Sequence, residues 1–466
     1  MVKYIGIVSF CKNRGIGFRN EIPWDMSTDL VQLENLTKGH IVVMGYSTYS
    51  TLLTVSGRLC DGRTHVVVTP NDVPEATGVI FSSVTNIDKV LAKLTGCCVV
   101  ETDVFVIGGE KIYEHFMNKF EYLYVTYLDR LFDFHEKFPE IDESFELVKF
   151  SNHGIDPESG CVVHRLEYQK TDGVNKVDRE YTELCKRVLK NNEGKRNDRT
   201  GTGTFSIFGD QIRFDISKSI PILTTKRIPW KSCIEELLWF LRGDTDANIL
   251  KGKGVNIWNG NSSKEAQSRV GLDHLREGDC GANYSFQWRY FGQEYISCET
   301  PYKKKTKYDQ IQNIIHLLKT DPHSRRIFMS SWNPMDLDNT VLPPCHVSAQ
   351  FYVSNDGLLS CHMYQRSCDV FLGLPWNILS YSILTHILAA ISGYKPGELV
   401  ISLGDTHIYM DHVHQVEQQI MRKPMSTPMI VVSKNMSEKL IEDICVDDFE
   451  VYGYFPHAAI SARMSV

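Results

Sequence analysis

Short apolar runs alternate with helix-like segments along the first third of the chain. The runs cover residues 4–10, 40–44, 65–69, 104–107 and 123–128. Helical spacing of apolar residues appears at 28–36 and 111–118. Strands that alternate with helices predict an α/β domain in which a mostly parallel, twisted sheet is flanked by helices. Two further runs, at 146–150 and 162–168, predict an antiparallel pair that closes this domain.

A different pattern begins near Asp178, where apolar residues recur at three- and four-residue spacing and predict a helix. Further on, alternation over 348–353, a turn at Asn355-Asp356-Gly357 and alternation over 358–364 predict a hairpin. Strands mixed with long apolar helices predict an α+β domain. We therefore expect a first domain over residues 1–170, a linker over 171–177 and a second domain over 178–466.

The stretch between Asp369 and Lys395 contains no charged residue and is long enough to be considered as a membrane span. Pro375, Asn377 and His386 interrupt its apolar pattern, and several serines lie among them. A buried core helix explains this mixture better than a helix in lipid. We expect no membrane-spanning segment.

Composition narrows the class of protein further. The chain has 466 residues, a net charge of −7 and a pI near 6.2, which argues against a general nucleic-acid binder. Its 13 cysteines form no CxxC pair, and the first residues lack a signal-peptide core. We expect a cytoplasmic protein with reduced thiols and no metal site.

Two places in the first block show a strand, then glycine, then a helix start. Gly45 follows the run 40–44, and Gly108-Gly109 follows 104–107. The N–H groups of a helix start, approached past a glycine, can hold a phosphate, so two such places could hold the ends of a dinucleotide. A glycine at a helix start without any ligand is the commoner case.

Asp29 is a candidate for proton chemistry. It shares a helical face with Leu33 and Leu36, and a carboxylate turned towards an apolar cleft can donate or relay a proton near neutrality. The alternative is structural, because an acidic residue in a first helical turn complements the helix dipole.

In the second block, Cys345 follows Pro343-Pro344 and precedes the predicted hairpin. A cysteine acts as a nucleophile when positive neighbours favour its thiolate, and arginine forks bind phosphate. Candidate arginines are Arg199, Arg325, Arg326 and Arg366. Taken singly, each arginine could be a solvated surface residue and Cys345 an inert buried thiol.

Five motifs follow one another in the first block: Gly15-Ile-Gly17, Ile22-Pro-Trp24, Asp29, Val43-Met-Gly45 with Thr48, and Ile107-Gly-Gly109 with Tyr113. On these motifs the block resembles dihydrofolate reductase along nearly its whole length. The resemblance implies NADPH-dependent reduction of dihydrofolate to tetrahydrofolate, with Asp29 holding the pterin ring and helping to protonate it. The folate residues that it implies are Trp24, Asp29, Leu33, Arg63 and Thr126. The NADPH residues that it implies are Gly15, Gly17, Gly45, Thr48, Gly108, Gly109 and Tyr113.

The first block departs from that family at three places near the expected cofactor. Tyr46 stands where a basic residue is common, Thr69-Pro70 replaces a serine-containing pair, and Glu110 adds a negative charge beside the Gly-Gly pair. These departures bear on the preference for NADPH over NADH.

The second block carries a longer series of motifs: Arg199-Thr-Gly-Thr-Gly203, Glu236-Leu-Leu-Trp-Phe-Leu241, Gln287-Trp-Arg289, Ser324-Arg-Arg326, Pro344-Cys-His346, residues 364–377, and Gly404-Asp-Thr-His407-Ile-Tyr409. On these motifs residues 178–466 resemble thymidylate synthase. The resemblance implies reductive methylation of dUMP to dTMP by 5,10-methylenetetrahydrofolate. The two resemblances together imply a fused, bifunctional enzyme.

The second resemblance also implies residue roles. Cys345 would attack C6 of the uracil, Glu236 and Tyr284 would organise water and proton transfers, and Asn377 would pair with the uracil edge. The dUMP site would contain Arg199, Arg325, Arg326, His346, Gln365, Arg366, Ser367, Asp369, Asn377, His407 and Tyr409. The folate would contact Trp258, Asp369 and Gly373.

The same resemblance implies a homodimer formed through the synthase domain, in which Arg325 and Arg326 reach the neighbouring active site, while the carboxyl end at Val466 folds over the site. Trp376 departs from the family, which usually has Phe before Asn377, and Asn283 stands in a segment that usually reads Gly-Pro-Val-Tyr-Gly.

Two alternatives stay open from the sequence. The synthase block could serve as an RNA-binding regulator, although the acidic balance gives this no support. One block could also be an inactive scaffold, although Asp29 and Cys345 are both intact. We expect small-molecule partners, with no membrane and no obligatory nucleic acid.

Overall fold

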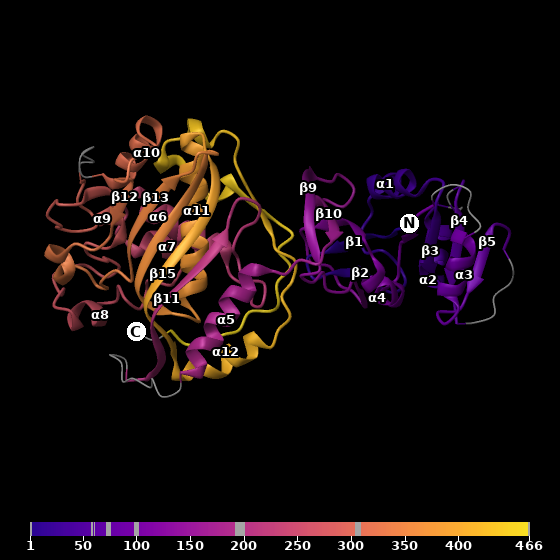
Figure 1. The fold of residues 1–466 in the computed structure, drawn as a ribbon, viewed down its shortest axis with the longest axis horizontal. Coiled ribbons are helices and arrows are strands. Elements are labelled where there is room, and N and C mark those ends of the chain that lie inside the picture. The colour runs from indigo at the N-terminus through magenta and orange to yellow at the C-terminus, as the bar shows by residue number, and fades with distance from the viewer. Residues whose placement is uncertain are drawn as a thin grey trace. The chain divides into compact units, whose positions relative to one another are not determined.

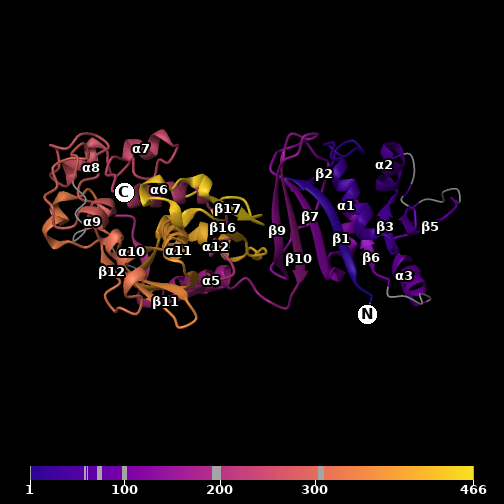
Figure 2. The same ribbon diagram turned by 90° about the horizontal axis from the view of Figure 1, so that it is seen from above.

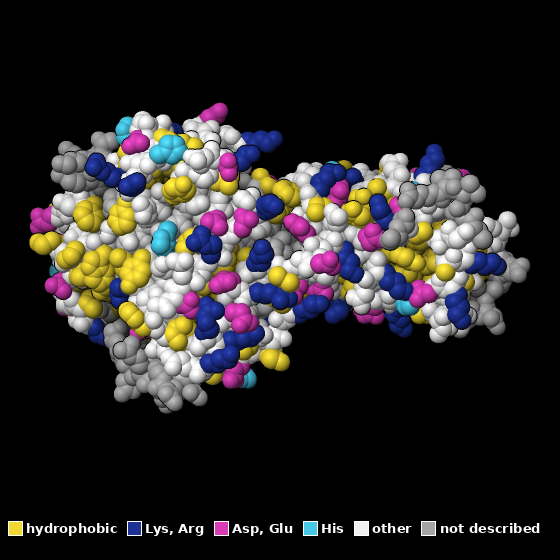
Figure 3. Space-filling view, viewed as in Figure 1, with side chains coloured by type: hydrophobic (Ala, Val, Ile, Leu, Met, Phe, Trp, Pro, Cys, Tyr) yellow, Lys and Arg dark blue, Asp and Glu magenta, His cyan; other side chains and the backbone are white. Residues whose placement is uncertain are grey.

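The computed structural model describes residues 2–56, 59, 61–70, 76–96, 102–191, 201–302 and 309–464. The chain divides into two compact units, Met1–Val174 and Asn175–Val466. Arg199 and Val466 lie outside the described residues. In each unit, Lys and Arg side chains alternate with Asp and Glu over the face shown in Figure 3, so neither visible face carries a field of one sign.

The first unit is built on one eight-stranded sheet. Its strands, in spatial order, are β5 (Val79–Ser82), β4 (Thr64–Val68), β3 (Ile41–Gly45), β6 (Val104–Val106), β1 (Tyr4–Cys11), β7 (Tyr122–Leu128), β10 (Val162–Lys170) and β9 (Phe145–Ile155). The pairs from β5 to β7 are parallel, and β10 runs antiparallel to both β7 and β9. Figure 2 shows β9, β10, β7 and β1 side by side. The predicted parallel sheet and its closing antiparallel pair are confirmed.

Helices connect the parallel strands, as the crossover between parallel neighbours requires. They are α1 (Ser27–Thr37), α2 (Tyr46–Ser56), α3 (Ile87–Gly96) and α4 (Glu110–Phe116), labelled in Figure 1. All residues of β3 and β6 are buried, which explains their continuous apolar runs. Two short strands outside the sheet, β2 (Gly15–Gly17) and β8 (Glu136–Lys137), pair with each other.

The second unit contains a five-stranded sheet in the order β11 (Thr204–Asp215), β15 (Lys395–Tyr409), β14 (Leu358–Asp369), β13 (His346–Val353) and β12 (Phe328–Ser330). β14 and β15 are parallel, and the other neighbours are antiparallel. The β13–β14 pair is the predicted hairpin. A small two-stranded sheet joins β16 (Met429–Val432) to β17 (Phe449–Tyr452). The mixed architecture confirms the predicted α+β class.

Helices cover this sheet and build the rest of the unit. They are α5 (Lys176–Lys190), α6 (Trp230–Arg242), α7 (Ala247–Gly252), α8 (Lys264–Arg269), α9 (Tyr284–Tyr290), α10 (Gln310–Thr320), α11 (Gly373–Ser392) and α12 (Val413–Ile420). Among the helices that the structure describes, α11 is the one that is long and apolar enough, by length and composition, to cross a membrane. It packs against β14 and β15, and 78% of its most apolar window is buried, so it forms part of the core, as the polar interruptions indicated.

The start of the second unit is anchored by a buried carboxylate. Asn175 caps α5 by accepting from the N–H of Asp178, and the last two residues of the predicted linker already belong to this helix. The Asp178 carboxylate accepts four hydrogen bonds of 2.6–3.0 Å from the N–H groups and hydroxyls of Thr224 and Thr225. These contacts satisfy a carboxylate that would otherwise be costly to bury.

Candidate active sites

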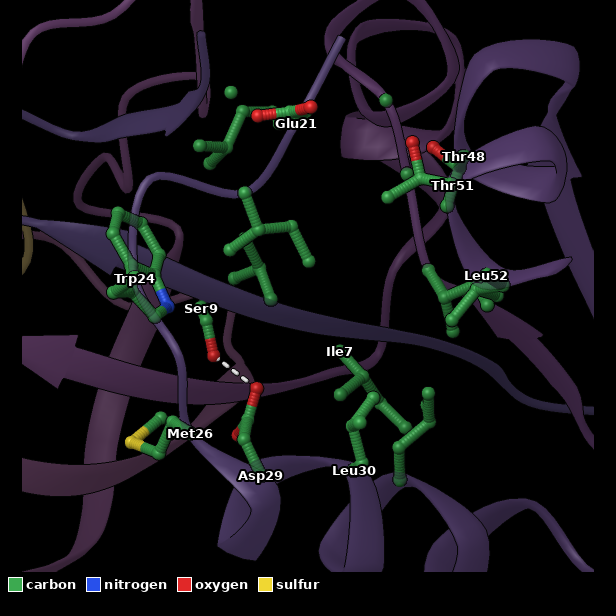
Figure 4. A pocket seen from close by; sticks show the side chains of 18 of the residues that line it. Ile7, Ser9, Glu21, Trp24, Met26, Asp29, Leu30, Thr48, Thr51 and Leu52 are labelled. Atoms are coloured by element: carbon green, nitrogen blue, oxygen red, sulfur yellow. Dashed lines mark hydrogen bonds between the residues drawn. The ribbon is translucent and has the colours of Figure 1, made fainter. Parts of the chain in front are cut away.

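A cavity of about 450 Å³ opens in the first unit between β1, the start of α1, the start of α2 and the Gly108-Gly109 turn. Eight of the predicted residues line it: Gly17, Trp24, Asp29, Leu33, Thr48, Gly108, Gly109 and Tyr113. Figure 4 shows Asp29 pointing into the cavity from α1, with Trp24 on one side and Thr48 across from it. The sequence motifs of the first block therefore converge on one concave site.

Two hydroxyls hold the Asp29 carboxylate. Thr126 Oγ1 donates to Asp29 Oδ1 at 2.7 Å, and Ser9 Oγ donates to Asp29 Oδ2 (Figure 4). Ser9 and Thr126 are direct partners in the β1–β7 ladder, which places their hydroxyls beside each other. The sequence analysis missed Ser9, because a serine within a strand gives no sign of its partner until the register is known.

The opposite wall brings backbone close to the cavity. The N–H of Gly45 donates to the Gly108 carbonyl at 2.7 Å. A Cβ built on Gly108, whose φ is +125°, would lie 3.2 Å from Thr48 Oγ1. Such a wall suits a ligand that approaches the main chain, which is the arrangement expected for the cofactor.

Tyr113 closes the inner end of this wall. Its hydroxyl donates to the Ile7 carbonyl at 2.7 Å. Burial, and then the charge of Asp29, raise the pKa of Tyr113, so the phenol stays neutral. Tyr113 is therefore a fixed donor and an apolar ring surface.

Four predicted residues are not among those that line the cavity: Gly15, Gly45, Arg63 and Thr126. Arg63 Nε donates to Thr37 Oγ1 at 2.7 Å, and its guanidinium also donates to the carbonyls of Glu34 and Asp61. Arg63 is thus bound to the carboxyl end of α1. Thr126 acts on the cavity through Asp29, as described above.

Glu158, which the sequence analysis also missed, holds the start of α1 from a distant loop. Its carboxylate accepts from both the N–H and the hydroxyl of Ser27, the latter at 2.7 Å. Asp156 stabilises the loop by accepting from the N–H groups of Glu158 and Ser159. Glu158 therefore fixes the helical turn that carries Asp29, and a carboxylate there complements the helix dipole.

In the second unit, strand register gathers the predicted nucleotide-site residues. His346 pairs with Gln365, Ser367 with Asp405, and Asp369 with His407. Tyr409 lies two residues beyond His407 on β15. Residues that are up to about 60 positions apart in sequence are thus neighbours at one end of the sheet.

Cys345 lies just before β13 and is half-buried. Its N–H donates to the Tyr284 hydroxyl at 2.7 Å, and its carbonyl accepts from the N–H of Arg366 at 2.9 Å. Tyr284 stacks on His346 with ring centroids 3.9 Å apart. Burial lowers the pKa of His346 to about 3, so this imidazole is neutral.

The position of Tyr284 depends on a local helix cap. Asn283 accepts from the N–H groups of Ser285 and Phe286 and begins α9 at Tyr284. Gly281, with φ of +70°, has no room for a Cβ, which would lie 2.2 Å from the Asn339 carbonyl oxygen. The departure at Asn283 therefore supplies a cap that stabilises the helix.

The Arg366 guanidinium lies beside the Cys345 segment. Its Nε donates to the Pro344 carbonyl at 2.7 Å and Nη2 donates to the Pro343 carbonyl at 2.9 Å. Arg325 and Arg326 are exposed in the turn before β12, the edge strand of the sheet. Arg366 is therefore held against the Cys345 segment of its own chain.

Polar side chains extend the site from Cys345 to α11. Gln365 Nε2 donates to Asn377 Oδ1 at 3.1 Å, which orients the Asn377 amide. His407 Nδ1 lies 3.0 Å from Asp405 Oδ1. Asp369 Oδ1 accepts from the N–H groups of Phe371 and Leu372 and stabilises the turn before Gly373.

Glu236 is buried on α6 between two indoles. Trp258 Nε1 donates to its Oε1 at 2.7 Å, and Trp376 Nε1 donates to its Oε2 at 2.6 Å. Burial raises the pKa of Glu236 to about 7, against the lowering effect of both indole hydrogen bonds. Such a carboxyl group can exchange a proton at neutral pH.

Lys226 is a buried cation that the sequence analysis missed. Its ammonium donates to the Phe371 carbonyl and lies 3.5 Å from the centre of the Phe371 ring. Burial lowers the pKa of Lys226 to about 7. The sequence signal was weak, because one lysine after Thr224-Thr225 resembles any surface lysine.

Comparison with known proteins identifies the family of each unit. The family model of dihydrofolate reductase matches residues 3–170, and that of thymidylate synthase matches residues 179–466. Bifunctional dihydrofolate reductase-thymidylate synthase of Paramecium tetraurelia is 37% identical over 99% of this chain and 98% of that protein. The protein of the same name from Leishmania major is 35% identical over 99% of this chain and 94% of its own length. Thymidylate synthase of Saccharomyces cerevisiae is 46% identical over 63% of this chain and 99% of that protein.

The fold and the two sites thus define a two-unit folate enzyme. The chain belongs to the family of bifunctional dihydrofolate reductase-thymidylate synthases. It carries both activities: it converts dUMP to dTMP with 5,10-methylenetetrahydrofolate, and it reduces the dihydrofolate formed to tetrahydrofolate with NADPH.

Proposed function

We propose that Asp29 binds the pterin ring of dihydrofolate and assists its protonation. The observation that carries this assignment is the carboxylate fixed by Ser9 and Thr126 at the base of the 450 Å³ cavity. Trp24 and Leu33 then supply apolar surface for the ring, and Arg63 pairs with the glutamate carboxylates of the substrate.

The cofactor wall fits NADPH, which supplies hydride. Gly17, Gly108 and Gly109 let the ligand approach the main chain, and Thr48 adds a hydroxyl at the start of α2. Tyr113 and the Gly45–Gly108 hydrogen bond shape this wall, and Gly15 belongs to β2 together with the lining residue Gly17. Glycine-lined helix starts are suited to phosphate groups.

In the second unit we assign the nucleophile to Cys345. Its sulfur forms a bond to C6 of the uracil, and C5 then takes the one-carbon unit. Asn377 pairs with the uracil edge, and its amide orientation is supported by the bond from Gln365. Glu236 and Tyr284 handle proton transfer, with His346 stacked on Tyr284.

The remaining residues bind the ends of the two substrates. Arg366 and Ser367, together with Arg199, bind the phosphate, while His407 and Tyr409 hold the ribose hydroxyl. Trp258, Asp369 and Gly373 contact the folate. Gly373 leaves space there, since the nearest atom to a Cβ built on it is 3.5 Å away.

The second unit is proposed to form a homodimer through its sheet. One face carries exposed aromatic side chains, with relative exposures of 48% for Phe328, 66% for Tyr352 and 42% for Tyr364. Phe328 opposes Gln350, which opposes His362, so the uncovered face is continuous across three strands. Large exposed apolar patches mark interaction sites.

In this dimer, Arg325 and Arg326 of one copy reach the phosphate in the other. A mixing experiment tests the arrangement. Cys345→Ser and a double Arg325→Ala, Arg326→Ala variant should each be inactive alone. An equimolar random mixture should regain about a quarter of the wild-type activity, because about half of its dimers are mixed and each mixed dimer has one intact site of two. No recovery in dimers shown to be mixed would contradict the assignment of the two arginines.

We also propose that the enzyme works in the cytoplasm. No disulfide joins the ten cysteines within the described ranges, which is what a reducing compartment maintains. Cell fractionation of the untagged protein tests this proposal, and recovery with an organelle or membrane fraction would refute it.

The experiment that tests both site assignments is NADPH oxidation by the purified protein, supplied with dUMP and 5,10-methylenetetrahydrofolate but no dihydrofolate. We expect oxidation that requires dUMP. Cys345→Ser should abolish it while added dihydrofolate is still reduced. Asp29→Asn should abolish reduction while dTMP is still formed. Either variant retaining full coupled activity would overturn its assignment.

A further inference from the structure

Trp376 occupies an unusual position beside Glu236. Its indole N–H donates to Glu236 Oε2 at 2.6 Å, while Trp258 donates to the other oxygen, Oε1, at 2.7 Å. The two indoles come from different segments, since Trp376 belongs to α11 and Trp258 to the loop after α7. A phenylalanine in place of Trp376 would leave Oε2 without this donor.

Helix α6 also holds the main chain of Trp376. The thiol of Cys233 donates to the Trp376 carbonyl at 3.4 Å. Cys233 and Glu236 are three residues apart and share one face of α6, so the two contacts bind the same turn of α11 from the same face. Because the next residue is Asn377, this arrangement links the proton-transfer group to the uracil-binding amide.

Few titratable groups face the Glu236 carboxylate. Cys233 on its own helix and Tyr284 from α9 interact with it electrostatically, and both are held neutral because burial raises their pKa. From α11 the residue that faces it is the uncharged Trp376. The neighbouring Glu235 instead pairs with Lys253 at 2.6 Å. In this apolar setting the two indole N–H groups are the donors that stabilise the ionised carboxylate.

We propose that Trp376 is a positioning residue for the synthase reaction: its indole N–H holds Glu236 Oε2, sets the direction of the carboxylate and stabilises its ionised form. The inference rests on the proposed role of Glu236 in proton transfer. Burial raises the pKa of Glu236 to about 7, and the hydrogen bond from Trp376 keeps it from rising further.

The first test is the pH profile of kcat for dTMP formation in Trp376→Phe. The ionisation of Glu236 sets one limb of this profile. That limb should move to higher pH, by on the order of one pH unit, because the ionised carboxylate loses a hydrogen-bond donor. The KM for dUMP should change little. Trp239→Phe is the matched control, since Trp239 is also buried but donates to the Asp246 carbonyl at 3.1 Å. The control should leave the limb in place.

A second measurement needs no substitution of Trp376. The chain has seven tryptophans, so a ¹H–¹⁵N spectrum of the unsubstituted enzyme contains their indole N–H signals. Two of them, assigned to Trp258 and Trp376, should shift together with the same midpoint near neutral pH, and both shifts should vanish in Glu236→Gln. Absence of a response at Trp376, or an unmoved limb in a folded Trp376→Phe, would overturn the inference.

The same variants separate this inference from the proposed function. If Glu236→Gln forms dTMP at the wild-type rate, the role assigned to Glu236 fails, whereas the spectrum still reports the hydrogen bond. Reduction of added dihydrofolate, which uses the other unit, verifies that each variant is correctly quantified, and urea unfolding compared with the wild type verifies that the second unit is folded.

Discussion

The main-chain N–H of Cys345 donates a 2.7 Å hydrogen bond to the hydroxyl of Tyr284. This contact joins the proposed nucleophile to the first residue of α9, and the stacked His346 ring holds the phenol in place. The reactive segment is therefore oriented by a side chain about 60 residues earlier in the chain.

Replacing Tyr284 with phenylalanine should lower kcat for dTMP formation by at least about tenfold, because Cys345 loses the acceptor that orients it and the site loses a proton-relay hydroxyl. Steady-state kinetics with dUMP measures the effect. Tyr394→Phe, which removes a half-buried hydroxyl bound to the Leu318 carbonyl, is the control and should retain activity. Equal loss in both variants would indicate general destabilisation.

Thr126→Val should reduce kcat/KM for dihydrofolate by about tenfold, since a hydrogen bond to a charged group contributes about 1.5–3 kcal/mol and Ser9 still holds the other oxygen. The spectroscopic NADPH assay measures this loss. Thr95→Val, which removes a hydroxyl bound to the Leu91 carbonyl within α3, should have no effect. An unchanged Thr126→Val enzyme would mean that Asp29 needs no support from β7.

Glu158→Ala should raise the KM for dihydrofolate more than the KM for NADPH, because the start of α1 loses its cap and the turn that carries Asp29 loosens. The first unit should also lose about 0.5–2 kcal/mol of stability, the usual effect of removing a helix cap. Urea unfolding and substrate titrations measure these effects. Glu146→Ala, on the exposed strand β9, is the control, and identical behaviour of both variants would contradict the capping role.

The second unit should lose stability as the pH falls below about 6.5. Burial lowers the pKa of His386 to about 4, so between these values the unfolded chain binds a proton that the folded state does not. The free energy of unfolding should therefore fall with decreasing pH, with about 1.4 kcal/mol per pH unit from this group.

His386→Gln tests that contribution. The variant should be less stable overall. Across this range, the slope of its unfolding free energy against pH should be smaller than the wild-type slope by the equivalent of about one bound proton. Urea unfolding at several pH values gives the slope, with the exposed His414→Gln as control. A wild-type slope in His386→Gln would show that other groups cause the pH dependence.

Tyr46→Arg should lower the KM for NADPH several-fold and leave the KM for NADH unchanged. Tyr46 is the first residue of α2 and is 46% exposed, so an arginine there can reach a phosphate at the helix start. Kinetics with the two cofactors gives the ratio. Tyr46→Glu should change the ratio in the opposite direction, and two variants with the same ratio would exclude a cofactor contact at this position.

Much of the fold could be read from local patterns. Apolar runs such as 40–44 and 104–107 predicted parallel strands, and both faces of the resulting strands β3 and β6 are buried. The hairpin around Asn355-Asp356-Gly357 followed from alternation and turn chemistry, since both are local properties. The uncharged stretch before Lys395 predicted a core helix for the same reason.

Candidate site residues were accessible where a reactive side chain stands in a recognisable motif, as with Asp29, Cys345 and Asn377. The residues that support them were not. Ser9, Glu158 and Lys226 have ordinary neighbours in the sequence, and their contacts exist because strand register or a distant loop brings them to the site. Trp376 was visible as a departure, but its bond to Glu236 was not.

By itself, then, the sequence determined the two-domain order and the fold classes, because periodicity is a property of neighbouring residues. Its motifs also carried the two family resemblances that imply the chemistry of each domain. The tertiary structure decided which donors satisfy Asp29 and Glu236 and which groups are neutralised by burial. Those outcomes depend on desolvation and on hydrogen bonds between residues far apart in the chain, and such contacts are defined once the sheets and helices have packed.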